Sequence, residues 1–413
     1  MRVLIANRML GTLLGGGETF DLNVARNLMK LGHDVTVVSA KPFFAPPKLS
    51  YPDLKIVYLP SPNLRFLEEK ARRVSQTLGA FWRYVDRYAF ERAVLSWLSL
   101  GGNYRLFGIV QCCSMFWLPK WVITHLNIPV VGWLPGPPSR FQLRLIRDLV
   151  SHPHFGLFTH GDSVRVLEDQ LGLVRGAEFE VIEPGIDLAA VELYESQREK
   201  FRKNLNLSDK TIVGATVARL ISTKNHPILI EGLQRVIRNL NVPLVWLMVG
   251  DGPERPFLER MTKAKGLKGY VRWLGQLEQS EVLRILAAAD IFALTSTYES
   301  FSIATLEAMA YGLPIIATDV GYLKTIVRES GGGILVSPGD VDGLAQAIAR
   351  LASDSDYRRQ LGENGRAYVQ RFNWPNIIAK LLRLYEQVIA GRPGLDSRLS
   401  GGSKTLPPRS QRG

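Results

Sequence analysis

Cysteine is scarce in this chain, and long apolar runs are absent. Its 413 residues include two cysteines, Cys112 and Cys113, which are adjacent and follow an apolar run. Two adjacent cysteines with no others argue against a disulfide framework and a metal site, so we expect buried free thiols. No apolar run approaches the roughly 18 to 20 residues that cross a bilayer. The first residues also lack a signal-peptide pattern, so we expect a cytoplasmic protein.

The charge is unbalanced toward basic residues. The chain has 51 Lys and Arg against 38 Asp and Glu, a formal net charge of +13. Such a charge suits an anionic partner, such as nucleotide phosphates, an acidic lipid surface or nucleic acid. Zinc-finger spacings and the strand signature of RNA-binding domains are missing, so we expect no nucleic-acid partner.

Length and composition predict two folded domains and a tail. A chain of 413 residues with 46% hydrophobic residues is too long for one core and suits two domains. Two domains imply a cleft between them. Residues 391–413 are rich in Gly, Ser, Pro and Arg, which predicts a disordered basic tail.

Short apolar runs with β-branched residues recur in two series, separated by segments of helical period. Continuous apolar strands alternating with helices predict α/β domains with doubly wound parallel sheets. The charged helical stretch 188–210 separates the series, so we expect domains at 1–190 and 191–372, with helix 373–390 completing the first. The first series of runs is 2–7, 34–40, 55–60, 106–111 and 129–134; the second is 211–220, 243–252, 270–275, 290–296, 313–319 and 333–338.

The segment TSTYESFSIATLEAMAYGLPIIATD (295–319) has the strongest functional pattern. It predicts a strand, a loop with Glu299, and a helix from about Ile303 that includes Glu307. The free backbone N–H groups of Ser302, Ile303 and Ala304 can meet an anion at the helix N-terminus. Glu299 can then bind sugar hydroxyls, and Glu307 the vicinal hydroxyls of a ribose. The competing interpretation is a pair of solvated glutamates.

Three further features point to a phosphate ligand. Arg219 and Lys224 follow the first strand of the second series, where two cations can neutralise a diphosphate and stabilise it as it leaves. Gly250 and Gly252 form a turn after the next strand and allow backbone to approach a ligand. Gly16 and Gly17 stand between the first strand and the first helix, a setting that favours anions. Each feature alone also fits surface charges or ordinary turns.

Read in order, these stretches resemble glycosyltransferase family 4. The resemblance runs from GGGE through EPGID (183–187), VARL, Lys224 and GDGP to the E-x7-E spacing of Glu299 and Glu307. It implies the GT-B fold, with two facing Rossmann-like domains, and transfer from a nucleotide-diphosphate sugar with retention of configuration and without a catalytic metal. It also implies site roles: diphosphate contacts from Arg219 and Lys224, donor-sugar contacts from Glu299 and the backbone after it (Phe301, Ser302, Ile303), and a ribose contact from Glu307.

The chain departs from the family pattern at several positions. Pro135 stands where members commonly have a histidine, and Tyr322 and Thr325 replace a usual glycine and acid. Ser302 stands where glycine is frequent. Other first-domain histidines that could substitute are His125, His152, His154 and His160. Because of Pro135, we keep as an alternative a nucleotide-sugar-binding or regulatory subunit without turnover. A nucleotide-sugar epimerase is a third interpretation, for which the sequence shows no general base.

The segment 64–100 mixes Arg and Lys with Trp, Tyr and Phe at helical spacing. This composition is compatible with peripheral contact at the anionic inner face of a membrane, which would bring a carbohydrate or lipid-linked acceptor to the enzyme. The alternative is a helix pair that packs on the first sheet and leaves a wet basic face.

Overall fold

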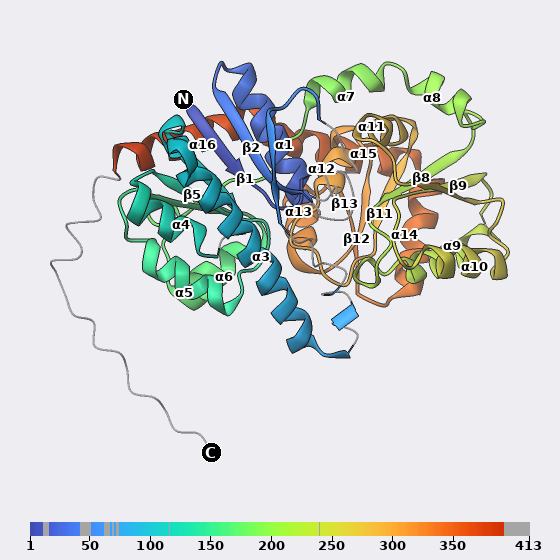
Figure 1. The fold of residues 1–413 in the computed structure, drawn as a ribbon. Helices are drawn as coiled ribbons and strands as arrows, with labels where there is room; N and C mark the ends of the chain where they lie inside the picture. Colours follow the sequence, from blue (N-terminus) through green and yellow to red (C-terminus); the bar gives the residue numbers. More distant parts are fainter. Residues whose placement is uncertain are drawn as a thin grey trace. The chain divides into compact units, whose positions relative to one another are not determined.

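The computed structural model describes residues 1–10, 16–41, 51–61, 67, 70–71, 74–114, 116–238 and 240–391. The predicted tail beyond Gly391 and the basic residues Arg72 and Arg73 lie outside these ranges. The chain divides into two units (Figure 1). Unit 1 holds Met1–Thr159, Val166–Ile182 and the described residues from Ile378 onward, and unit 2 holds His160–Arg165 and Glu183–Ile377.

Unit 1 is built on a parallel sheet of seven strands in the order β3-β2-β1-β4-β5-β6-β7. In β1 the buried residues Val3, Leu4 and Ile5 pair with β2 on one side and β4 on the other, which makes β1 and β4 the point where the strand order reverses. The predicted strands are all present, whereas β6 and β7 were not expected. The bounds are β1 Arg2–Ala6, β2 Asp34–Lys41, β3 Ile56–Pro60, β4 Ile109–Cys113, β5 Val130–Leu134, β6 Phe155–Thr159 and β7 Glu180–Val181.

Helices cover the sheet of unit 1 around an aromatic core. Phe20 contacts Trp133 with ring centroids 4.3 Å apart, and Trp133 stacks on Phe158 at 5.9 Å. Cys112 and Cys113 are free thiols; Cys112 is buried, as expected, while Cys113 is only partly buried. Burial raises the pKa of both well above its usual value. The helices are α1 Gly16–Lys30, α3 Gln76–Ser99, η1 Leu100–Leu106, α4 Leu118–Trp121, η2 Val122–Leu126, α5 Arg140–Leu149, the second half of α6 Asp162–Leu171, and most of α16 Trp374–Ala390.

Unit 2 repeats the architecture with six parallel strands in the order β10-β9-β8-β11-β12-β13. The chain forms β8, β9 and β10 in order toward one edge of the sheet. It then crosses back to form β11 beside β8, followed by β12 and β13 toward the other edge. The order therefore reverses between β8 and β11, which pair through Ile291 and Gly214. The bounds are β8 Ile212–Val217, β9 Leu244–Val249, β10 Val271–Gly275, β11 Ile291–Leu294, β12 Ile315–Thr318 and β13 Gly333–Val336.

Two hydrophobic clusters cover the faces of this second sheet, one with α11 and α12 and the other with α9 and α14. The segment predicted as a linker forms α7 and α8, whose Val191 and Phe201 belong to the core of unit 2. The helices are α7 Leu188–Glu195, α8 Arg198–Asn204, η3 Ser222–Lys224, α9 His226–Ile237, α10 Arg255–Ala264, α11 Gln279–Ala288, α12 Ile303–Ala310, α13 Gly321–Ser330, α14 Val341–Ser353, α15 Ser355–Val369 and η4 Gln370–Phe372.

The predicted fold class is confirmed: both units are α/β, and their sheets are parallel throughout. Continuous apolar strands such as β11, all of whose residues are buried, occur where helices cover both faces of a sheet. None of the helices in the described ranges is both long enough and apolar enough to span a membrane.

Candidate active site

The predicted site residues of unit 2 follow the carboxyl ends of β8, β9 and β11. This is the edge of an open parallel sheet at which ligands bind, beside the strands where the order reverses. Arg219 and Lys224 follow β8, Gly250 and Gly252 follow β9, and Glu299 follows β11. The fold thus brings to one edge three segments that are far apart in the sequence.

The loops after β8 and β9 are held together by backbone contacts. Ala218 donates to Val249 O at 3.0 Å, Leu220 donates to Asp251 O at 2.9 Å, and Glu254 donates to Leu220 O at 3.1 Å. A Cβ atom on Gly250 would lie only 1.9 Å from Ala218 O. The two glycines therefore serve this close packing of loops, a role that the sequence interpretation did not include.

Arg219 lies between these contacts with its side chain exposed. Its carbonyl oxygen accepts from His226 Nε2 at 3.1 Å, so this ring nitrogen carries the proton. Burial lowers the pKa of His226 to about 4, which keeps the ring neutral. His226 therefore fixes the backbone at Arg219, while the guanidinium has no partner within the part of the chain that the structure describes.

Lys224 and Glu299 form an ion pair, and both side chains are mostly buried. Ser296 Oγ also donates to Glu299 at 3.5 Å. The two loops are joined nearby, because Thr297 N–H donates to Thr223 O at 2.8 Å and Thr295 Oγ1 donates to Asn225 O at 3.1 Å. Lys224, which is predicted to bind the diphosphate, and Glu299, which is predicted to bind the donor sugar, therefore contact each other directly.

Helix α12 begins at Ile303, as the sequence predicts, and Ser302 is its N-cap. Ser302 Oγ accepts from Thr305 N–H at 3.3 Å and from Thr305 Oγ1 at 2.8 Å. Serine at this position thus caps the helix, which a glycine could not do with a side chain. The N–H groups of Ile303 and Ala304 have no acceptor among the described residues, so the helix start can receive an anion.

Glu307 is buried one turn into α12, and burial raises its pKa to about 7. Its Oε1 accepts from Gln279 Nε2 at 2.6 Å. Gln279 opens α11, 28 residues before Glu307, and the sequence interpretation missed it. No local pattern around Gln279 indicates this contact.

Phe301 lies between His160 and Tyr322. Its ring centroid is 4.8 Å from that of His160 and 5.2 Å from that of Tyr322, which it stacks against. Burial lowers the pKa of His160 to about 4. His160 is thus the candidate histidine that contacts the loop of Glu299, while Tyr322 N–H donates to Glu299 O at 2.9 Å.

In unit 1, Gly16 and Gly17 form the first turn of α1 rather than a loop before it. A Cβ on Gly17 would lie 3.7 Å from Pro135 Cβ, so the proline directly after β5 packs against this helix start. Asp21, one turn further on, accepts from Asn7 Nδ2 and Gln111 Nε2, both at 2.7 Å. Burial raises the pKa of Asp21 to about 7.

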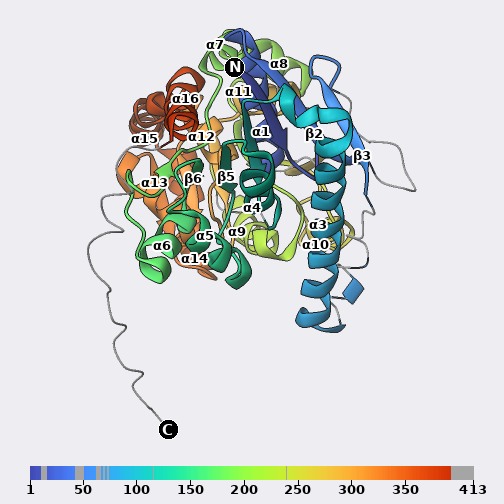
Figure 2. The same cartoon turned by 60° about the vertical axis from the view of Figure 1, so that its left-hand side comes forward.

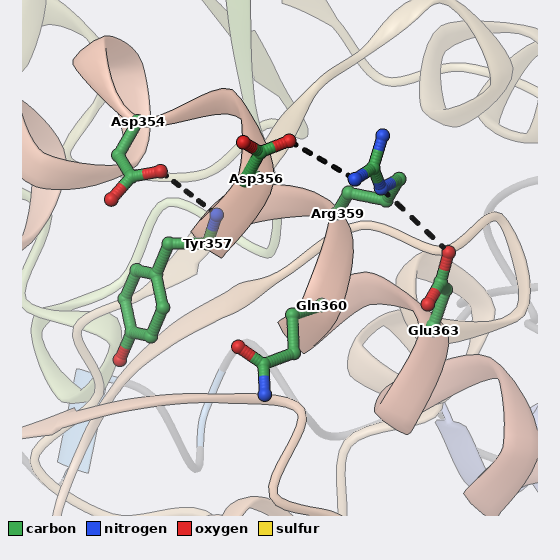
Figure 3. A pocket seen from close by; sticks show the side chains of 6 residues that line it. All are labelled: Asp354, Asp356, Tyr357, Arg359, Gln360 and Glu363. Carbon is green, nitrogen blue, oxygen red and sulfur yellow. Dashed lines mark hydrogen bonds and ion pairs between the residues drawn. The ribbon is translucent and has the colours of Figure 1, made fainter.

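A surface hollow lies elsewhere in unit 2, along the first turns of α15 (Figure 3). Asp354 caps the helix by accepting from Tyr357 N–H, and Arg359 pairs with Asp356 and Glu363. Asp356, Arg359 and Glu363 therefore pair among themselves, and none of the residues around the hollow is a predicted site residue. Among the described residues, no three His, Cys, Asp or Glu side chains are placed to hold a metal ion.

The fold and the site define a class. Two Rossmann-like parallel-sheet units are the parts of the GT-B fold. Unit 2 places cations, carboxylates and an open helix start beside the point where its strand order reverses. Residues 197–368, the part that contains this site, match the family model for glycosyl transferases group 1. The part of the chain that contains this site is therefore similar to this glycosyltransferase family.

Individual relatives agree with this placement. The chain is 32% identical over 219 residues to a D-inositol 3-phosphate glycosyltransferase of Corynebacterium urealyticum, a match that spans 52% of this chain and about half (50%) of that protein. It is 25% identical to an MMP alpha-(1->4)-mannosyltransferase of Mycolicibacterium hassiacum over 94% of this chain and 99% of that one. The structure of sucrose-phosphate synthase from Thermosynechococcus elongatus superposes with a TM-score of 0.71 at 21% identity, covering 94% and 99% of the two chains.

Proposed function

We propose that this protein is a retaining glycosyltransferase that moves a sugar from a nucleotide-diphosphate donor to the hydroxyl of a carbohydrate, lipid-linked or small-molecule acceptor. The observation that carries the proposal is the Lys224–Glu299 pair beside the open N-terminus of α12. A cation and a helix start suit the diphosphate, and a carboxylate beside them suits the hydroxyls of the sugar attached to it.

In this proposal each residue has one role. Arg219, Lys224 and the N–H groups of Ile303 and Ala304 bind the diphosphate. Glu299 and the backbone at Phe301 and Ser302 bind the donor sugar. Glu307 binds the two ribose hydroxyls. The relatives' names add sugar transfer as the shared type of reaction and leave the base, the sugar and the acceptor open.

The proposed reaction is a displacement on one face of the sugar. The acceptor oxygen forms a bond to C1 while the bond from C1 to the phosphate oxygen breaks, and the acceptor proton passes to that leaving oxygen. Negative charge grows on the diphosphate during this step. Arg219 and Lys224 then bind it more strongly than in the ground state, which is the condition for lowering the barrier.

Replacing Arg219 tests the proposal. Its guanidinium is exposed, so Arg219→Ala should keep the fold and lower sugar transfer or donor hydrolysis about 100-fold to 1000-fold. Arg260→Ala, on the exposed surface of α10, is the matched control and should behave like the unchanged protein. Unchanged turnover in Arg219→Ala would remove this site assignment.

Pro135 supports one competing function. It packs against Gly17 where the family commonly has a histidine, which would suit a nucleotide-sugar-binding subunit without turnover. Such a protein would gain thermal stability with nucleoside diphosphates and form no product with any acceptor. A nucleotide-sugar epimerase would instead form an epimer without any acceptor, so product analysis separates all three.

We also propose that unit 1 docks on an acidic membrane at the inner face through α3, which is long in both views (Figure 1, Figure 2). Leu78, Phe81 and Tyr88 are more than two-fifths exposed, as is Trp117, whose ring contacts Tyr88 at 6.2 Å. The exposed Arg92 lies one turn beyond Tyr88. Exposed aromatic and aliphatic side chains beside arginine suit an interface with anionic lipid.

Sedimentation with vesicles tests this contact. Vesicles that contain acidic lipid should bind the protein, while neutral vesicles should not. The double change Phe81→Ser and Arg92→Glu should abolish binding, whereas Arg260→Glu on α10 should not. Equal binding of both variants would exclude α3 as the membrane-contacting surface.

A further inference from the structure

Glu307 is held by a side chain from another helix. Gln279 belongs to the first turn of α11, and its Nε2 donates to Glu307 Oε1 at 2.6 Å. Glu307 is 8% exposed, while Gln279 is exposed. The contact therefore joins a buried carboxylate to a carboxamide at the surface.

This hydrogen bond fixes the direction of the carboxylate. A glutamate side chain has a broad terminal torsion, so its two oxygens are poorly oriented unless a partner holds one of them. With Oε1 engaged by Gln279, the plane of the group is set. Bidentate recognition of two adjacent hydroxyls depends on such an orientation.

We propose that Gln279 is a positioning residue that orients Glu307 toward the vicinal hydroxyls of the donor's ribose, so that the pair selects ribonucleotides over 2′-deoxyribonucleotides. The proposal rests on the proposed function, because it assigns the selectivity of the same donor site. Gln279 acts through Glu307 and has no role in the chemical step.

The surroundings of Glu307 add a second readout. Burial raises the pKa of Glu307 to about 7, and the Gln279 hydrogen bond opposes that rise. Tyr311 on α12 is a titratable group that interacts with Glu307, and its pKa is raised by burial and by Glu307. Asp187, Tyr194 and Glu195 interact with Tyr311 in turn, and Glu195 pairs with Arg366 of α15. Ionised Glu307 offers more acceptor lone pairs to ribose, so ribonucleotide affinity should rise as the pH increases through 7.

The experiment measures binding of uridine, guanosine and adenosine diphosphates and of their 2′-deoxy forms to the whole protein. The variants are Gln279→Leu and, as a matched control, Gln360→Leu at an exposed glutamine of α15. For the base that binds, Gln279→Leu should weaken the ribonucleotide about 10-fold or more, the usual effect of a lost hydrogen bond to a charged group. The 2′-deoxy form should bind Gln279→Leu with the same affinity as it binds the unchanged protein.

Kinetics and pH complete the test. Gln279→Leu should raise the donor KM and leave kcat within about 2-fold, as expected for lost uniform binding. The pH midpoint of ribonucleotide affinity should move upward in this variant. Equal weakening of ribo and deoxy forms, or a lower kcat at unchanged KM, would overturn the inference. Failure of the unchanged protein to bind any nucleoside diphosphate would instead reject the proposed function.

Discussion

At the scale of single residues, three glycines let the loops of unit 2 approach one another. A Cβ atom would lie 1.9 Å from Ala218 O at Gly250, 1.8 Å from Ser300 O at Gly161, and 2.1 Å from Glu299 O at Gly321. All three also have positive φ angles. Glycine is needed there for two reasons, since a side chain would both clash with backbone and strain the conformation.

We predict that Gly250→Ala destabilises unit 2 by at least about 2 kcal/mol, because it combines backbone strain with a clash. Urea unfolding followed by circular dichroism measures the loss. Gly269→Ala is the control: no atom lies within 4 Å of its added Cβ, so its effect should stay within about 0.5 kcal/mol. Equal stability of the two variants would show that the loop of Ala218 moves away freely.

At the scale of elements, α16 is tied to the sheet of unit 1 by packing and by a buried polar chain. A Cβ on Gly156 of β6 would lie 2.7 Å from Val388, so the helix sits close on the strand. Tyr385 OH donates to Gln111 Oε1 at 2.6 Å, and Gln111 donates in turn to Asp21 of α1. This chain connects α16, β4 and α1 through groups that have no access to water.

We predict that Tyr385→Phe lowers the free energy of unfolding of unit 1 by about 1 to 3 kcal/mol, because it leaves a buried acceptor on Gln111 with one donor fewer. Thermal or urea unfolding provides the measurement. Tyr270→Phe, at a tyrosine that is 41% exposed, should change stability little. A neutral result for Tyr385→Phe would mean that another donor reaches Gln111.

At the scale of the whole molecule, the two units respond to acid in opposite ways. In unit 1, burial raises the pKa of Asp21 and of Glu91 to about 7. The folded state then keeps protons that the unfolded chain releases, so unit 1 gains stability as the pH falls from 7 toward 4.5. The partly exposed His33 and His152, whose pKa values burial lowers, oppose this only weakly because solvent screens them.

The response of unit 2 to acid is dominated by His160 and His226, whose pKa values burial lowers to about 4. Unfolding lets both take up protons below pH 6.5, so unit 2 loses stability there. The pKa of Glu307 is raised, so Glu307 contributes stability as the pH falls, which offsets the stability lost through one of the two histidines. Each fully buried group changes stability by at most about 1.4 kcal/mol per pH unit.

We predict that calorimetric transitions of the two units move apart between pH 6.5 and pH 5, unit 1 upward and unit 2 downward. The variant Glu91→Gln identifies the transition of unit 1, because it should make the stability of unit 1 alone less dependent on pH. Glu91 accepts from the N–H groups of Phe116, Trp117 and Leu118, so this variant also lowers unit 1 stability at every pH. Parallel movement of both transitions would contradict the prediction.

The sequence by itself determined the fold class, the strands of both series and the start of α12 at Ile303. These follow from local patterns: continuous apolar runs mark buried parallel strands, and the alternation with helices marks doubly wound sheets. It left out β6 and β7, and it placed Gly16 and Gly17 before α1 instead of in its first turn. Short strands and helix ends are where local signals are weakest.

Only the tertiary structure decided which side chains meet. Lys224 and Glu299 are 75 residues apart, Gln279 and Glu307 are 28 apart, and Tyr385 and Gln111 are 274 apart. His160, one of four candidate histidines in the sequence, meets Phe301 because of how Gly161 packs under Ser300. Such contacts depend on how strands and helices pack across the fold, and the residues on either side of each partner do not encode that packing.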